Sequence, residues 1–385
     1  MSFAFRMPPL VLVGTGAWRR VGVEARRLGG KKALIVSGQA MIKAGFMAEM
    51  RKLLEAEGLE SVLFDRVTEE PTTQHVEEGL RLLRDEGCDL VIGFGGGSPI
   101  DAGKAIAVMA TNPGRISDYM GADKLKAPKI PFIAVNTTAG TGSEVTGNTI
   151  ITDTETDVKM LITDPLIIPD VAIDDPTLTL SCPPEVTASS GMDALTHAIE
   201  AYVSRRANPI SDVLALPAIR RIAGNLRRAW ERGDDLEARS EMTLAALEAG
   251  MAFSNSSVAL VHGMARPIGA YFHIPHGLSN AMLLPYVMEF SIEGAPQRFA
   301  DIAAAMGEDV EGLSTVEAAR RAVDAVMALK DDLRIPSLSG AGVDAARLLE
   351  LAPKMAQDAI ASGSPANNPR IASSEEIVEL YKKAL

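Results

Sequence analysis

The chain has 385 residues, of which 47% are hydrophobic and 23% charged, and its formal net charge is −12. At roughly 100–200 residues per domain, this length predicts a globular protein of two or three domains. No apolar stretch reaches the ~20 residues of a membrane span, the start lacks the pattern of a secretion signal, and the acidic balance disfavours a nucleic-acid partner. We therefore expect a cytoplasmic protein with neither a membrane nor a nucleic acid as partner.

The cysteine content also excludes some classes of protein. Cys88 and Cys182 are the only two cysteines, and neither belongs to a C-x-x-C pair. Two thiols are too few for a disulfide scaffold and fit a reducing compartment. They are also too few for a zinc site built from thiolates.

The first half of the chain alternates short apolar, β-rich runs with helical patterns. This alternation predicts a parallel sheet whose strands are joined by crossover helices. A helix is expected from His75 to Glu86, where leucines recur at helical spacing. Strands are expected at residues 33–36, 61–64, 90–94 and 131–135, followed by a hairpin over 148–153 and 158–162.

The composition changes after Cys182. Ala, Leu, Met, Glu and Arg then recur with a period of 3.6 residues, which predicts helices over 239–251, 314–329 and 343–355. The last helix has a capping box, Ser373-x-x-Glu376, at its start. We therefore divide the chain into an α/β domain, residues 1–182, and an all-α domain, residues 183–385.

A run of glycines, Gly95, Gly96 and Gly97, joins an apolar strand to a helix. Glycines let a ligand approach the backbone closely, and the free amides at the helix start attract a diphosphate. We expect Ser98 to be the N-cap residue of this helix and Asp101 its acidic capping-box partner. A tight turn without a ligand is the alternative, but such a turn needs only one or two glycines.

A second polar loop, residues 137–144, follows the next expected strand. Its hydroxyls and amides lie at the carboxyl end of a strand, where open α/β sheets bind ligands. A loop rich in Ser and Thr is usually only a turn, but two such loops on successive strands favour a binding site. Gly14-Thr15-Gly16 lacks the third glycine of a dinucleotide fingerprint and is interpreted as a turn.

The histidines suggest a metal site. Asp193 and His197 lie four residues apart in an expected helix and so share one face. His262, His273 and His276 follow within a short glycine-rich stretch. One Asp with three His is a common ligand set for iron(II), zinc, cobalt or manganese. Taken alone, the Asp193 and His197 pair would favour an ordinary capped or hydrogen-bonded histidine, but four of the five histidines fall in two short apolar, glycine-rich regions.

Together these motifs resemble the iron-containing (group III) alcohol dehydrogenases over essentially the whole chain. The resemblance rests on the glycine loop with Ser98 and Asp101, on loop 137–144, and on segments 191–202 and 262–277. It implies an N-terminal dinucleotide-binding α/β domain and an all-α domain, an architecture shared with dehydroquinate synthase. It also implies a homodimer or larger homo-oligomer that transfers hydride between nicotinamide and a small primary alcohol or aldehyde.

The resemblance also implies roles for individual residues. The expected ligands of iron(II) or zinc are Asp193, His197, His262 and His276. The expected contacts of NAD or NADP are Gly38, Gly95, Gly96, Gly97, Ser98, Asp101, Thr137, Thr138, Thr141, Asn148 and Lys159.

Three positions depart from the family pattern. Gly38 stands where NAD-selective members often carry an Asp, so a 2′-phosphate should be tolerated. Glu70 could oppose that phosphate, and the choice of cofactor therefore stays open. Arg266 replaces a histidine of many members and cannot carry a proton at neutral pH, which makes His273 the expected proton carrier. Arg266 is expected to bind a cofactor phosphate or a substrate carboxylate, as in an ω-hydroxy acid, or to form a salt bridge on its helix.

Other functions remain as alternatives. A glycerol dehydrogenase-like or dehydroquinate synthase-like member would share the architecture. The latter needs several cationic side chains around the metal, and the sequence offers mainly Lys159 and Arg266. A non-catalytic metal- or nucleotide-binding protein is the third alternative. Net formation of NAD(P)H from simple alcohols would separate the dehydrogenase from the synthase.

Overall fold

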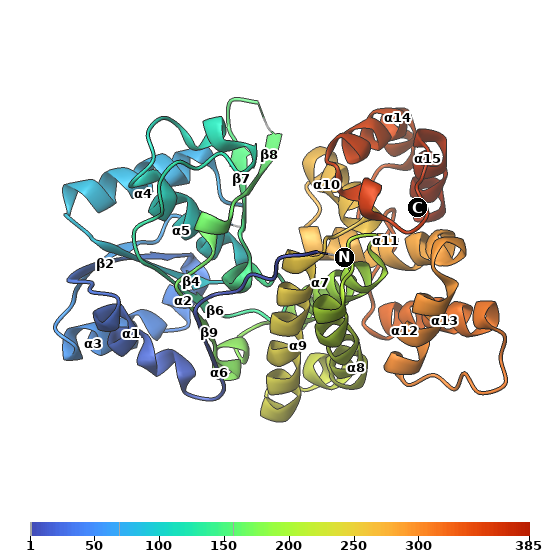
Figure 1. Cartoon of the computed structure of the whole chain (residues 1–385), viewed down its shortest axis with the longest axis horizontal. Coiled ribbons are helices and arrows are strands. Elements are labelled where there is room, and N and C mark those ends of the chain that lie inside the picture. Colours follow the sequence, from blue (N-terminus) through green and yellow to red (C-terminus); the bar gives the residue numbers. More distant parts are fainter. Residues whose placement is uncertain (1, 69, 157) are drawn as a thin grey trace. The chain divides into compact units, whose positions relative to one another are not determined.

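The computed structural model describes residues 2–68, 70–156 and 158–385. The chain divides into two compact units, Arg6–Ser181 and Cys182–Leu385, and the first residues, up to Phe5, are grouped with the second unit (Figure 1). This division lies one residue before the boundary expected from composition. The first residues were expected in the α/β domain, so their grouping with the helical unit is a difference from that expectation.

The first unit is built on a parallel sheet with the strand order β1-β9-β6-β4-β2-β3. All neighbouring strands in it are parallel, and every residue of β4 and β6 is buried, as expected for strands covered on both faces. The four strands predicted from the sequence are all present. The bounds are β1 Leu10–Val13, β2 Lys32–Ser37, β3 Glu60–Phe64, β4 Leu90–Gly95, β6 Phe132–Asn136 and β9 Val171–Asp174.

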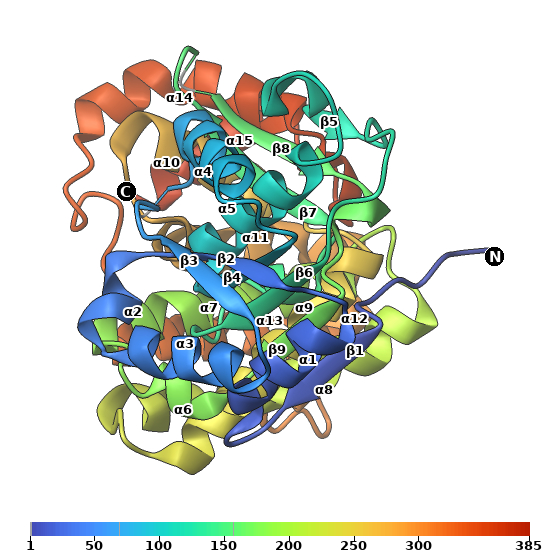
Figure 2. The ribbon, with the colours of Figure 1, turned by 90° about the vertical axis from the view of Figure 1, so that its left-hand side faces the viewer.

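Helices pack on both faces of this sheet and create two separate cores. Side chains alternate along a strand, so Val91 of β4 joins the core beneath α4 and α5, while Leu90 and Ile92 join the core beneath α1 and α3. Figure 2 shows these two helical layers above and below the sheet. The helices of this unit are η1 Ala17–Arg20, α1 Val21–Arg27, α2 Gln39–Lys43, α3 Phe46–Ala56, α4 Thr73–Asp85, α5 Gly97–Met109 and α6 Pro176–Thr179.

A small second sheet contains the predicted hairpin. Strands β7 (Asn148–Asp153) and β8 (Val158–Thr163) are antiparallel, with Asn148 opposite Thr163, and β5 (Gly121–Ala122) pairs with β8. Residue 157 lies outside the described residues. Three short 3-10 helices complete the unit: η2 Ile116–Tyr119, η3 Ser143–Val145 and η4 Pro165–Ile167.

The second unit consists of helices throughout its described residues. Helix α7 lies at its centre, packed against α8, α9 and α11, and is buried continuously from Gly191 to Val203. The predicted capping box at Ser373 and Glu376 is confirmed. The bounds are α7 Pro184–Val203, α8 Pro209–Glu231, α9 Leu236–Asn255, α10 Leu260–Phe272, α11 His276–Ser291, η5 Ile292–Gly294, α12 Pro296–Met306, α13 Thr315–Asp332, α14 Ala345–Ala361, η6 Ser364–Asn367 and α15 Ser374–Lys383.

The expected fold class, an α/β unit followed by an all-α unit, is confirmed. Among the described residues no single helix is long and apolar enough to cross a membrane. Helices α9 and α10 taken together have the required length and apolar composition, but the chain bends by 103° between them.

The start of α5 differs from the prediction. The helix begins at Gly97 with Gly96 as its N-cap residue, so Ser98 lies inside the first turn and is not the cap. Glycine has no Cβ and allows the sharp change of direction at Gly95, where φ is +152°, so the helix can start earlier. Asp101 consequently lies too far along the helix to complete a capping box. Its carboxylate accepts hydrogen bonds from Ser143 Oγ and from a backbone amide of β7 instead.

Candidate active site

The two polar loops follow β4 and β6, which are neighbours in the parallel sheet. A Cβ on Gly97 would lie 2.9 Å from the Thr141 side chain, and one on Gly96 would lie 3.2 Å from Thr138. The amide of Thr137 donates to the carbonyl oxygen of Gly95 at 3.0 Å. The structure therefore brings the predicted glycines and threonines into direct contact at one edge of the sheet, next to the start of α5, where free amides can bind an anion.

A buried lysine, Lys104 of α5, forms hydrogen bonds with the second polar loop and with the residues that follow it. Its ammonium donates to Ser143 Oγ at 3.1 Å, to Thr146 Oγ1 at 3.1 Å and to the backbone oxygen of Asn148 at 2.8 Å. Burial lowers the pKa of Lys104 to about 8, and the carboxylate of Asp101 opposes this shift. The contacts of Asp101 and of the Asn148 carbonyl thus hold α5, η3 and β7 together. No role was assigned to Lys104 from the sequence, although a lysine in so apolar a helix indicates a buried charge with specific partners.

Two carboxyl groups lie buried beside the second loop. Burial, and then the neighbouring Asp174, raise the pKa of Glu144 well above its ordinary value, and neither of its carboxyl oxygens has a hydrogen-bond partner among the described residues. Burial likewise raises the pKa of Asp174 to about 7, although the amide of Asn136 donates to its Oδ1 at 3.1 Å. At neutral pH Glu144 is therefore expected to be protonated, which reduces the cost of burying it.

Gly38 and Glu70, which were expected to affect the choice between NAD and NADP, follow β2 and β3, which are neighbours in the parallel sheet. Gly38 follows β2 directly as the N-cap residue of α2, and a Cβ there would lie 3.2 Å from the carbonyl oxygen of Val67. Lys159 Nζ forms an ion pair with Glu70 Oε1 at 2.5 Å. The sequence interpretation treated these two charges separately. Their pairing means that Lys159 offsets part of the negative charge that Glu70 would present to a 2′-phosphate.

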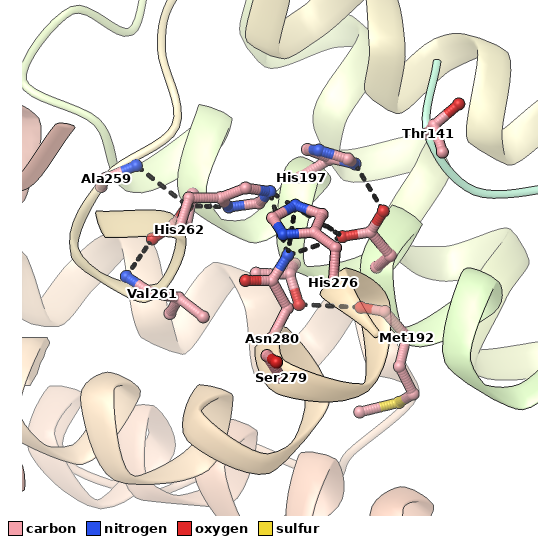
Figure 3. Close-up of polar contacts among 12 residues, drawn as sticks. Thr141, Met192, His197, Ala259, Val261, His262, His276, Ser279 and Asn280 are labelled. Carbon is pink, nitrogen blue, oxygen red and sulfur yellow. Dashed lines mark hydrogen bonds and ion pairs between the residues drawn. The ribbon is translucent and has the colours of Figure 1, made fainter. Parts of the chain in front are cut away.

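The helical unit brings Asp193 of α7, His262 of α10 and His276 of α11 together. One potential ligand atom from each lies within 4.8 Å of the others, and Asp193 Oδ1 is 3.8 Å from His262 Nε2 and 3.9 Å from His276 Nε2 (Figure 3). Burial tends to raise the pKa of Asp193, but the three histidines around it, His197 included, bring the pKa below its ordinary value. The His276 side chain is 38% exposed, so this cluster is accessible from one side.

The fourth predicted ligand, His197, lies beside this group. Its ring stacks between Phe253, at 4.2 Å, and His262, at 4.5 Å. Its Nδ1 is 4.0 Å from Asp193 Oδ2 and is buried without a hydrogen-bond partner among the described residues. A buried, unpaired nitrogen next to a carboxylate is costly unless a further group binds it. The donor set of one carboxylate and three imidazoles, with this unpaired nitrogen, fits a divalent transition metal.

A carboxylate that sequence reasoning did not single out fixes the orientation of His262. Glu200 of α7 lies 2.6 Å from His262 Nδ1 and accepts hydrogen bonds from the backbone amides of Ala259 and Val261. Burial, and then the other two imidazoles, lower the pKa of His262 well below its ordinary value, so the ring is neutral. Its Nδ1 then carries the proton toward Glu200, and its Nε2 lone pair faces the cluster. Ligating histidines in metal sites usually have such a carboxylate partner.

Two residues discussed from the sequence lie outside this cluster. His273 ends α10 with a left-handed φ of 55°, and its exposed side chain makes no hydrogen bond or ion pair with the described residues. Arg266 follows His262 by one helical turn, so both lie on one face of α10. The Arg266 side chain is half-buried. Burial lowers the pKa of its guanidinium, and the negative charge of Glu200 opposes this shift.

The salt bridge that was one expectation for Arg266 does not form. No described carboxylate lies within 4.0 Å of its guanidinium, and no described acceptor takes a hydrogen bond from it. Glu200, whose negative charge opposes the lowering of the Arg266 pKa, is already bound by two amides and by His262. The guanidinium therefore keeps its hydrogen-bonding capacity for another group.

Comparison with protein families defines the class of protein. Residues 8–176 match the model "Iron-containing alcohol dehydrogenase", and residues 187–385 match "Fe-containing alcohol dehydrogenase family, C-terminal". The chain therefore belongs to the iron-containing alcohol dehydrogenase family, as its motifs predicted, and it is an alcohol and aldehyde oxidoreductase.

Individual relatives are similar over nearly the whole chain. The 1,3-propanediol dehydrogenase of Citrobacter freundii is 43% identical over 385 residues, 99% of this chain and 98% of that protein. The lactaldehyde reductase of Escherichia coli strain K12 is 42% identical over 374 residues, 96% of each chain. Among solved structures, that of a 1,3-propanediol oxidoreductase has a TM-score of 0.97 at 42% identity and covers 100% of both chains.

The contact between Glu200 and His262 leads to a first prediction. Glu200→Gln keeps the size of the side chain but removes the charge that orients the His262 proton. We expect affinity for Zn²⁺ to fall about 10- to 100-fold, as for other partners of metal-ligating histidines. Competition with a chromophoric chelator measures this affinity. Glu248→Gln, which changes a carboxylate bound to Arg221, is the matched control, and equal affinities in the two variants would contradict the assigned role of Glu200.

Proposed function

We propose that this protein is a metal-dependent, NAD(P)-linked dehydrogenase of primary alcohols that also reduces the corresponding aldehydes. The observation that carries this proposal is the cluster of buried Asp193 and His262 with the partly exposed His276, and the unpaired nitrogen of His197 beside it. The contacting glycine and threonine loops of the α/β unit supply the second requirement, a place for a dinucleotide. The relatives named as dehydrogenases and reductases favour this activity over that of a dehydroquinate synthase.

The ligands we propose for iron(II) or zinc are Asp193, His197, His262 and His276. Such an ion supplies a Lewis acid that polarises the oxygen of the alcohol or aldehyde. Asp193 contributes a negative charge, while Glu200 keeps the Nε2 lone pair of His262 directed at the same point. The burial of these side chains limits the access of water and so strengthens the electrostatic interactions among them.

We propose NAD or NADP as the hydride carrier, bound by the loops after β2, β4 and β6. The absence of a carboxylate at Gly38 supports acceptance of NADP, and the ion pair of Glu70 with Lys159 weakens the repulsion of a 2′-phosphate. A relative from Bacillus methanolicus, 39% identical, is named an NAD-dependent methanol dehydrogenase, which supports NAD. The proposed contacts are Gly38, Gly95, Gly96, Gly97, Ser98, Asp101, Thr137, Thr138, Thr141, Asn148 and Lys159.

From the resemblance to the iron-containing alcohol dehydrogenases we also propose that the protein is a cytoplasmic homodimer or larger homo-oligomer. Cys88 and Cys182 are both reduced thiols, and burial raises the pKa of Cys88 to about 11, which keeps it unreactive. Light scattering of the purified protein would determine the oligomeric state.

Replacement of a proposed ligand tests the metal site. His262→Ala and His276→Ala should each lose the bound metal and reduce turnover by about 10³-fold or more, because a Lewis acid contributes several kcal/mol to such a reaction. Binding of NADH, followed by its fluorescence, should be retained, because the proposed cofactor loops belong to the other unit. His75→Gln, in a histidine that caps α4, is the control. Full turnover of a metal-free variant would falsify the assignment.

The proton carrier we propose is His273, because it is exposed to solvent and lies three residues before His276. His273→Asn keeps a residue that tolerates the left-handed backbone conformation. We expect kcat to fall by about 10²-fold, at the low end for a lost proton-transfer group. Added imidazole should restore part of the rate. A kcat of His273→Asn equal to that of the wild type, or no recovery of the rate with imidazole, would exclude His273 as the carrier.

The unpaired guanidinium of Arg266 supports a finer proposal, that the substrate is an ω-hydroxy acid or its aldehyde. A carboxylate is the planar anion that a guanidinium binds through two parallel hydrogen bonds. We expect kcat/KM to be higher for ω-hydroxy acids than for alcohols of equal length. Arg266→Ala should lower kcat/KM for the acids about 10- to 100-fold, from 1.5–3 kcal/mol per charged hydrogen bond, and leave simple alcohols little changed. Equal values for both classes in the wild type would contradict this proposal.

A further inference from the structure

Asn280 of α11 is a fully buried residue to which neither the motifs nor the family resemblance assigned a role. It follows His276 by four residues, so the two side chains share one face of the helix. Asn280 Nδ2 lies 2.7 Å from Asp193 Oδ1, 3.1 Å from His262 Nε2 and 3.2 Å from His276 Nε2 (Figure 3). A single amide group therefore contacts the same three atoms that form the candidate metal cluster.

The two ends of this amide have very different surroundings. Its nitrogen offers two hydrogens to three acceptors, whereas its oxygen, Oδ1, is buried without a hydrogen-bond partner among the described residues. A buried carbonyl oxygen left without a hydrogen-bond donor is unfavourable, because it has lost its contacts with water. In this orientation the amide nitrogen of Asn280 donates toward Asp193, His262 and His276, while the amide oxygen is left without a hydrogen-bond donor.

A cation among these three atoms would reverse that preference. The amide hydrogens carry partial positive charge, so they cannot face a cation that the same carboxylate and imidazole atoms bind. Rotation about the Cβ–Cγ bond of asparagine exchanges the nitrogen and the oxygen, and this torsion has a broad, roughly two-fold profile. After that rotation Oδ1 faces the cluster, and a carbonyl oxygen is a suitable donor for a divalent cation.

We propose that Asn280 is a further residue of the metal site, with different roles before and after a divalent cation binds. Before binding, its N–H groups hold Asp193, His262 and His276 together. This keeps the ligands close and reduces the repulsion among the lone pairs of their oxygen and nitrogen atoms. After binding, its Oδ1 faces the cation. This inference rests on the proposed metal site, and it adds a neutral oxygen donor to the predicted set of one carboxylate and three imidazoles.

Two substitutions at this position distinguish an oxygen donor from an N–H donor. Asn280→Ala removes both, and Asn280→Asp keeps an oxygen of similar reach but removes the N–H groups. If Oδ1 faces the cation, Asn280→Ala should bind Zn²⁺ about 10-fold more weakly than the wild type, and Asn280→Asp should bind it more tightly than Asn280→Ala. Chelator competition on the full-length protein measures both. Affinity of Asn280→Asp equal to or below that of Asn280→Ala would overturn the proposal.

The neighbouring residue provides a matched control. Ser279 is also fully buried on α11, but its hydroxyl donates to the backbone oxygen of Pro275, away from the cluster. Ser279→Ala should therefore bind Zn²⁺ as the wild type does. In the presence of a chelator, Asn280→Asp should have a lower melting temperature than the wild type, because two carboxyl groups then adjoin each other, and Zn²⁺ should raise its melting temperature more than it raises that of the wild type.

A second measurement covers the case in which Asn280→Asp does not fold. The visible absorption spectrum of bound Co²⁺ depends on the number and type of its ligands, so the spectra of the wild type and Asn280→Ala should differ. Identical spectra would overturn the proposal. The two levels of inference fail differently: a wild-type protein that binds neither Zn²⁺ nor Co²⁺ contradicts the metal site itself, whereas tight binding with identical spectra contradicts only the role of Asn280.

Discussion

The buried carboxylate of Asp193 is the constraint on which the helical unit depends. A carboxylate in the middle of an apolar helix is expensive unless charges or hydrogen-bond donors surround it. Helices α10 and α11 bring those groups to α7, as His262, His276 and Asn280. Glu200, two turns further along α7, binds the first turn of α10 through its backbone amides. The packing of these three helices is therefore specified by polar contacts as well as by the apolar core.

The α/β unit also contains a buried charged group, and here the charge is positive. Lys104 is buried within α5, and three oxygen acceptors from η3 and β7 receive its ammonium hydrogens. These contacts fix the loop that begins after β6, while the glycines after β4 let the loop threonines approach the start of α5. A ligand at this edge would therefore meet loops that are already held in place, which reduces the entropy lost on binding.

Local patterns were enough to predict the strands, the hairpin and the helical second half, because hydrophobic periodicity acts over neighbouring residues. They failed at Gly96, where the freedom of glycine moved the helix start, and the salt bridge that was one alternative for Arg266 finds no partner among the described residues. Glu200 and Asn280 could not be found in this way. Glu200 contacts His262, 62 positions away, and Asn280 contacts Asp193, 87 positions away. Spacing within one helix shows only that Asn280 shares a face with His276.

The distances in sequence between the clustered residues have a further consequence. A bond that joins distant points of a chain lowers the entropy of the unfolded state, and the effect grows with the length of the loop that it closes. This chain has two thiols and forms no disulfide between them. An ion bound by α7, α10 and α11 would act as the missing cross-link, so that the helical unit would owe part of its resistance to unfolding to the same ion that serves its chemistry.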